Sequence, residues 1–136
     1  MVMGIKRILS LTQLVTAFIA VLFAAQFVFT QSRDDADVTA LMRAAREGER
    51  ENVQALLQQA VDINAKDSSG WTALIYAAAK GDAAIVKALL DKGADVNAKS
   101  TTGYTALQAA AQYGNTAAAK LLVEKGAGVN DKDDNG

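Results

Sequence analysis

The sequence predicts an all-helical solenoid of three stacked repeats, preceded by a hydrophobic N-terminal helix. Two observations lead there. Landmark residues recur at a fixed interval of thirty-three positions, so that Gly70 and Gly81 return as Gly103 and Gly114. Each interval passes from a polar, glycine-containing stretch into two helical patterns, and a period of this length is typical of stacked repeats. The expected units cover residues 34–66, 67–99 and 100–132, with 133–136 as the start of a fourth.

Residues 1–32 are predicted to be a signal peptide or an N-terminal membrane anchor. Lys6 and Arg7 precede a run from Ile8 to Ser32 that carries no charge. A helix of that length could cross a hydrocarbon core of about 30 Å. The alternative is cleavage after the shorter apolar region from Leu14 to Ala25, which small residues follow. In both readings the basic residues keep the N-terminus in the cytosol, so the repeats at 33–136 are expected to be exported.

The expected location is therefore periplasmic or secreted, or else the inner membrane with the repeats outside the cytoplasm. Membrane contact is expected only through residues 8–32, if they stay uncleaved. The sequence has no Cys and no Asn-x-Ser/Thr acceptor, which favours a bacterial periplasm over a secretory lumen.

Composition excludes several classes of function. Without Cys or His there is no thiol nucleophile, no thiolate metal site and no imidazole base. The full chain has a formal charge of -1, and removing Lys6 and Arg7 leaves 12 basic against 15 acidic residues. A mildly acidic body gives no electrostatic footprint for nucleic acid, so none is expected as a partner.

The middle unit justifies each helix in turn. Thr72 precedes the run 73–80 and can cap its exposed N–H groups. Gly81 interrupts the run, and a second helix is expected from Asp82 or Ala83 to Asp91. Gly93 follows as the residue that ends it in a left-handed conformation. One face of the second helix is predicted to be buried, through Ile85, Val86, Leu89 and Leu90.

The pattern DxxGxTxLxxAxxxGxxxxVxxLLxxGAxxNxx, which covers Asp34 to Lys132, resembles the ankyrin repeat. The resemblance implies a helix-turn-helix in each unit, with a short hairpin-like finger between units. It also implies a non-catalytic module that binds another protein. The chain departs from the family pattern at the start of each first helix, where Ala replaces the usual Pro and no His follows. The missing His removes a hydrogen bond between repeats, so we expect a looser stack.

The two ends of the stack are predicted to differ. In the first unit Thr39 is expected at the start of the first helix, Asp37 replaces the turn glycine, and Ala60 replaces the glycine after the second helix. Its charged helices suit a terminal repeat that caps the stack. The third unit remains apolar, from Ala117 to Val123, and is therefore uncapped. The alternatives are further repeats, a truncated chain, or a C-terminal face covered by a partner or by another copy through self-association. A membrane-tethered scaffold assembled through this face is the alternative function.

The resemblance places partner contacts on the fingers and on the first helices. Trp71 and Tyr104 occupy the same position in adjacent units, so they should lie side by side and form a hot spot. Packing between fingers is the competing role. For Trp71 packing and partner binding are weighed equally, whereas for Tyr104 partner binding is favoured. Tyr76 is expected in packing between repeats. The other contact candidates are Val38, Ser68, Ser69, Thr101 and Thr102 on the fingers, and Arg46, Glu47, Ala79, Lys80, Gln112 and Tyr113 on the helices, with Lys66 and Lys99 adjoining them.

No catalytic residue, cofactor or metal site is predicted. The run from Asp131 to Gly136 matches the first half of a calcium loop, but its bidentate Glu is missing and the repeat pattern accounts for the same residues. The serines at 68, 69 and 100 lie in turns without a His to activate them.

Overall fold

The structure is a computed structural model that describes residues 14–22 and 37–134. The chain divides into two units, residues 1–35 and 36–136. The cleavage sites, the charges at 33–35 and the repeat position of Gly136 lie outside the described residues. Residues 14–22 are helical and their side chains are exposed. No helix within 14–22 or 37–134 is long and apolar enough to cross a membrane.

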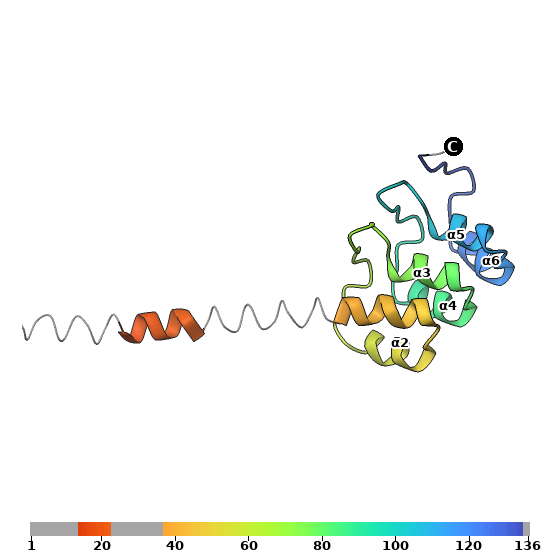
Figure 1. Cartoon of the computed structure of the whole chain (residues 1–136). Coiled ribbons are helices and arrows are strands. Elements are labelled where there is room, and N and C mark those ends of the chain that lie inside the picture. Colours follow the sequence, from red (N-terminus) through yellow and green to blue (C-terminus); the bar gives the residue numbers. More distant parts are fainter. Residues whose placement is uncertain (1–13, 23–36, 135–136) are drawn as a thin grey trace, which may run out of the picture. The chain divides into compact units, whose positions relative to one another are not determined.

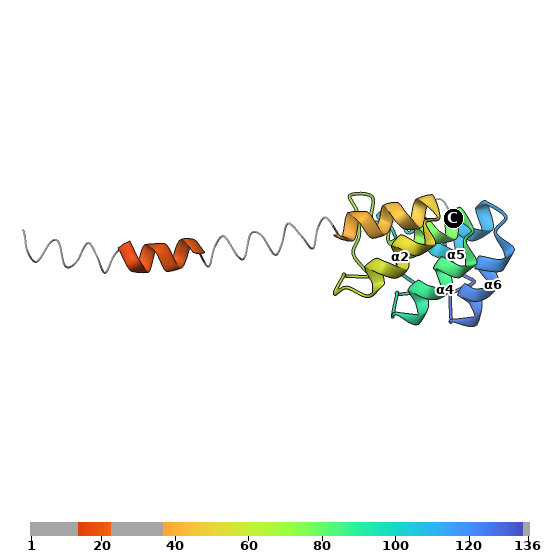
Figure 2. The ribbon, with the colours of Figure 1, turned by 90° about the horizontal axis from the view of Figure 1, so that it is seen from below.

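Residues 37–134 contain three pairs of helices, one pair in each repeat unit, which confirms the predicted all-helical repeat fold (Figure 1). The connections between pairs project on one side as fingers, and α2, α4 and α6 form a row on another (Figure 2). The pairs are the helix over residues 37–47 with α2 (Arg50–Leu57), α3 (Ala73–Lys80) with α4 (Ala83–Asp91), and α5 (Ala106–Gln112) with α6 (Thr116–Glu124).

The middle unit has the helix bounds that its sequence predicts. The Ile75 N–H donates to Thr72 Oγ1 at 3.3 Å, which caps α3. Asp82 accepts from the N–H groups of Ala84 and Ile85 at 3.1 and 3.2 Å and caps α4. Between the two helices Gly81 takes a left-handed φ of 83°, which permits the sharp reversal.

The first unit differs from the prediction at its start. Residues 37–47 are helical, so Thr39 lies inside the helix and does not begin it, and Asp37 and Val38 are not on a finger. The corresponding turns of the other units depend on Gly70 and Gly103, whose φ values are 74° and 76°. Asp37 lacks the freedom of glycine, so the helical conformation prevails over the turn at this position.

The core runs through the stack from unit to unit. Its fully buried large side chains are Leu41, Val53, Leu74, Ile75, Ile85, Val86, Leu89 and Leu122, and Leu90 is partly buried beside them. Burying one such aliphatic side chain stabilises the fold by about 1.5–3 kcal/mol. The predicted apolar face of α4 is therefore part of this core.

The third unit leaves part of its apolar surface uncovered. Ala78 of α3 has no exposed area, whereas Ala111, at the same position of α5, is exposed. Leu74 is 1% exposed, while its counterpart Leu107 is only partly buried. Val129 beyond α6 is 66% exposed. The difference arises because units one and three flank α3, whereas no described helix covers the far side of α5.

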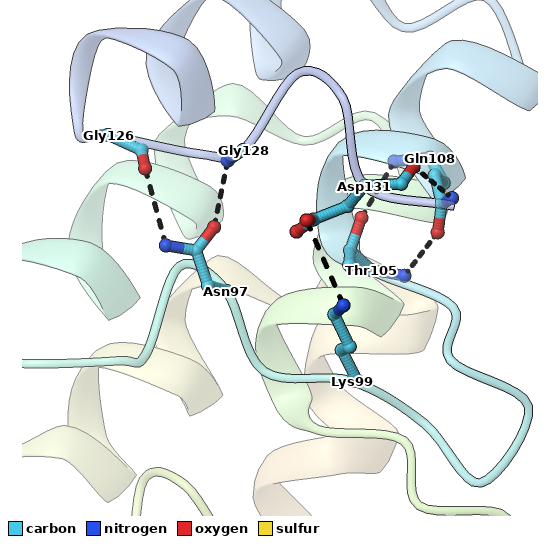
Figure 3. Close-up of polar contacts among 7 residues, drawn as sticks. All are labelled: Asn97, Lys99, Thr105, Gln108, Gly126, Gly128 and Asp131. Atoms are coloured by element: carbon cyan, nitrogen blue, oxygen red, sulfur yellow. Dashed lines mark hydrogen bonds and ion pairs between the residues drawn. The ribbon is translucent and has the colours of Figure 1, made fainter. Parts of the chain in front are cut away.

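Asparagine side chains join the ends of successive units. Asn97 Nδ2 donates to the Gly126 carbonyl at 3.3 Å, and its Oδ1 accepts from the Gly128 N–H at 2.8 Å (Figure 3). Asn64 makes the equivalent pair of bonds to Gly93 and Asp95, at 3.3 and 2.7 Å. The Asn at this position therefore fixes the spacing of one unit against the next.

Gln108 adds a polar link within the third unit (Figure 3). Its side chain accepts from the Thr105 N–H at 2.8 Å and donates to the Asp131 carbonyl at 3.1 Å. Gln108 stands where the resemblance leads us to expect His, and within the third unit it bonds the start of α5 to the loop after α6. The predicted loosening of the stack remains a prediction.

A second joint lies between α3 and α6. Asn115 precedes α6 but makes no capping bond; its Nδ2 donates to the carbonyls of Ala78 and Ala79 at 2.8 and 2.9 Å. Asp82, at the same position of the second unit, caps its own helix and pairs with Arg50 Nε at 2.8 Å. Both side chains at this repeat position thus bond across the boundary between units, Asp82 as a charge and Asn115 as an amide, and only Asp82 also caps its own helix.

Candidate functional site

The finger of the second unit is organised by the carboxylate of Asp67. Its Oδ1 accepts from the Ser69 and Trp71 N–H groups at 2.8 and 2.9 Å, and its Oδ2 accepts from the Tyr76 hydroxyl at 2.6 Å. Burial opposes ionisation of this carboxyl, but the three hydrogen bonds outweigh it and lower the pKa of Asp67. The same bond to Asp67 raises the pKa of Tyr76. Asp67 therefore stays ionised and holds the finger against α3.

Three aromatic rings lie together around Trp71: Tyr104 of the next finger is stacked on it, and Tyr76 of α3 is tilted against it. The Trp71 ring lies 4.9 Å from that of Tyr76 and 5.8 Å from that of Tyr104, measured between centroids, and the second pair is inclined by 23°. The prediction that Trp71 and Tyr104 lie side by side is confirmed. Tyr76 was expected in packing between repeats, which stays a prediction; its ring contact with Trp71 and its hydrogen bond to Asp67 lie within its own unit. All three rings are partly exposed.

The next finger replaces the carboxylate by a hydroxyl. Ser100 Oγ accepts from the N–H groups of Thr102 and Tyr104 at 3.3 and 3.1 Å. The Thr101 N–H and hydroxyl both donate to the Ser69 carbonyl, at 3.1 and 3.0 Å, and so tie the two fingers together. Ser69 and Thr101 thus contribute to the joint between fingers, and the neighbouring Ser68 and Thr102 remain exposed.

The predicted helix residues lie beside this stack. Gln112 accepts a hydrogen bond from the Tyr104 hydroxyl, which brings α5 and its finger together. Burial is the largest cause of the raised pKa of Tyr104, followed by the proximity of Tyr113 and Asp133. Tyr113 is 59% exposed. Arg46 lies close enough to Tyr76 for its charge to act on the phenol.

The remaining predicted positions are exposed and less closely joined. Arg46 and Glu47 approach each other at 3.8 Å. Lys80 is exposed and lies beside Gly48, apart from the ring stack. Lys66 Nζ donates to the Lys99 carbonyl at 2.7 Å and so joins the first unit to the second.

Three residues of this region were not among the predicted sites. Asp67 organises the finger, Tyr76 completes the ring stack, and Arg43 occupies in the first unit the position that Tyr76 has in the second. The repeat spacing could have identified Arg43, because counting back thirty-three positions from Tyr76 reaches it. Nothing in the spacing indicates that Asp67 and Tyr76 are bonded to each other.

Acidic side chains do not gather into a metal site in the described part of the chain: no three His, Cys, Asp or Glu residues are placed to hold an ion there. The proposed calcium-loop pattern extends into residues 135–136, which lie outside the description. The surface described above consists of aromatic edges, hydroxyls, amides and cationic side chains, which suit binding by contact and hydrogen bonds.

Comparison with known proteins is consistent with this geometry. A search of curated protein sequences found no significant match. The family model described as ankyrin repeats (3 copies) matches residues 41–133, which is more than half of the chain. The matched segment contains α2 to α6, the two complete fingers and the aromatic stack. The chain belongs to the ankyrin repeat family.

Proposed function

We propose that this protein is a non-catalytic binding module that recognises another protein through its fingers and the adjacent faces of its first helices. Ankyrin repeats are in general protein–protein interaction modules and are typically non-catalytic. The observation that carries the proposal is the partly exposed stack of Trp71 and Tyr104, with Gln112 and Tyr113 beside it. Aromatic residues of this kind dominate the energetics of protein interfaces.

The proposed contact surface extends on both sides of that stack. Ser68 and Thr102 provide exposed hydroxyls on the fingers, and Arg46, Glu47 and Lys80 provide exposed charges on the first helices. Trp71 has a second role, because its ring is packed between Tyr76 and Tyr104. Replacing Trp71 by Ala therefore affects folding as well as binding.

A pull-down of the full chain tests the surface. A Tyr104→Ala and Tyr113→Ala double variant is expected to recover less partner than the natural sequence, with a Lys92→Ala and Lys120→Ala double variant as control. Circular dichroism checks that both variants remain helical. Equal recovery by all three proteins would refute the proposed surface.

We further propose export of the repeats, with residues 1–32 as a signal peptide or anchor. The support is the uncharged run after Lys6 and Arg7 and the exposed apolar side chains of residues 14–22, such as Phe18 at 66%. Mass analysis of the mature N-terminus separates the two versions. A new terminus near Ala25 or Ser32 indicates cleavage, whereas an intact terminus in the membrane fraction indicates an anchor. An intact chain in the cytosol contradicts both.

A second candidate function is self-association through the uncovered face of the third unit. Ala111 is exposed on α5, and Leu107 beside it is only partly buried. Analytical ultracentrifugation of the full chain should then show a dimer or larger species that Ala111→Glu disrupts. Ala55→Glu, at an exposed position of α2, is the matched control. A monomer over the whole concentration range refutes this candidate.

A further inference from the structure

The binding surface proposed above has more hydrogen-bond donors available than acceptors in its first two units. The Trp71 indole N–H, the Arg43 guanidinium and the Lys80 ammonium have no acceptor among the described residues, and Arg46 has only the distant contact with Glu47. Arg43 and Arg46 take the positions of Tyr76 and Ala79 one unit later, so they lie on the same side as the ring stack. Arg43 and Arg46 are therefore available to a partner that covers the rings, whereas Lys80 lies apart from them beside Gly48.

Acceptors on the same surface are largely occupied. Both carboxylate oxygens of Asp67 already accept hydrogen bonds, from two N–H groups and the Tyr76 hydroxyl. Gln112 Oε1 accepts from the Tyr104 hydroxyl. Glu47 adds a carboxylate that lies near Arg46. Further carboxylates are that of Asp37, at the start of the helix that carries Arg43 and Arg46, and those of Asp133 and Asp134 at the third-unit end, where Asp133 acts on Tyr104. The guanidinium groups of the surface therefore lie at its first-unit end, and its third-unit end is acidic.

From this imbalance we infer that the surface binds an extended peptide segment with acidic side chains beside an aromatic or aliphatic anchor. An extended segment has backbone carbonyls that no bond of its own occupies, so it can accept from the Trp71 N–H, whereas a helix uses most of its carbonyls internally. Carboxylates of the segment pair with Arg43 and Arg46, for which a planar guanidinium is well suited. The acidic part faces the first unit, because Asp133 and Asp134 repel it at the other end.

This inference rests on the proposed binding surface. One experiment has different outcomes for a failure of the acidic-peptide inference and for a failure of the binding surface. A displayed library of random linear peptides is selected on the immobilised full chain. Enriched peptides should combine Asp or Glu with an aromatic or aliphatic residue. An Arg43→Ala and Arg46→Ala double variant should bind them at least about tenfold more weakly, because a hydrogen bond to a charged group contributes about 1.5–3 kcal/mol. The Lys92→Ala and Lys120→Ala variant makes the same change in net charge elsewhere and should bind normally.

A third variant isolates the indole donor without removing the ring. Trp71→Phe keeps an aromatic side chain between Tyr76 and Tyr104 but loses the N–H, so weaker binding by a folded variant supports the predicted bond. Enriched peptides without acidic residues that nevertheless depend on Tyr104 and Tyr113 would overturn the acidic-peptide inference and leave the proposed surface in place. Peptides that depend on none of these residues would overturn both, and the absence of any enrichment would refute recognition of a linear segment.

Discussion

Replacing Gly81 by Ala should destabilise the fold more than the same change at Gly114. Both glycines occupy the same repeat position and both have a left-handed φ, of 83° and 69°. An Ala in that conformation costs about 1–2 kcal/mol in either unit. At Gly81 the new Cβ would also lie 2.4 Å from Asn115 Oδ1, whereas at Gly114 it meets no atom within 4 Å. Asn115 must then move away from the Ala78 and Ala79 carbonyls.

The extra cost follows from those two hydrogen bonds. Each contributes about 0.5–1.5 kcal/mol, so Gly81→Ala should exceed Gly114→Ala by about 1–3 kcal/mol in the free energy of unfolding. Urea unfolding followed by far-UV circular dichroism and by the fluorescence of Trp71, the single tryptophan, measures both. In an Asn115→Ala background the difference should largely disappear. Equal costs for the two glycines, or a difference that persists without Asn115, would refute the steric explanation.

Three further predictions concern the joints, the finger and the core. Asn97→Ala, which removes two bonds between units, should lower the free energy of unfolding by about 1–3 kcal/mol in chemical denaturation. Asn130→Ala, at the same position of the last unit with no described partner, should have almost no effect. Hydrogen bonds lower the pKa of Asp67 below its usual 3.8, so its stabilising contribution is complete above about pH 4 and is lost as the pH falls through the lowered value. Asp67→Asn should therefore flatten the loss of stability in acid. An unchanged pH profile of stability in this variant would contradict the role assigned to Asp67. Leu74→Ala should lower the free energy of unfolding by about 2–5 kcal/mol and Leu107→Ala by clearly less, because Leu74 is fully buried and Leu107 only partly. Thermal unfolding compares the two variants. Equal losses of stability would mean that the outer face of α5 is covered in solution.

The repeat spacing predicted most of the fold because the chemistry of each helix end is local. Thr72, Gly81 and Asp82 act on backbone groups within a few residues of themselves, so their types are sufficient to place α3 and α4. The start of the first helix was predicted wrongly by the same logic. Comparison with the other units put a turn at Asp37, but without a glycine the turn has no conformational advantage over the helix.

The candidate site was only partly predictable, since spacing locates a side chain but does not give its direction. Equal repeat position was enough to put Trp71 beside Tyr104. It could not indicate that Tyr76 of α3 is bonded to Asp67 in the finger of the same unit. That hydrogen bond joins two side chains that are nine residues apart.

The replacement of Asp82 by Asn115 one unit later changes how this repeat position responds to salt. Between the first and second units the position contributes the ion pair of Arg50 with Asp82, whose strength falls as ionic strength rises. Between the second and third units it contributes an uncharged amide bound to two carbonyls, which salt screens little. The ion pairs of Lys99 with Asp131 and of Lys125 with Asp91 also join the second and third units, so salt weakens contacts at both boundaries while the Asn115 bonds persist.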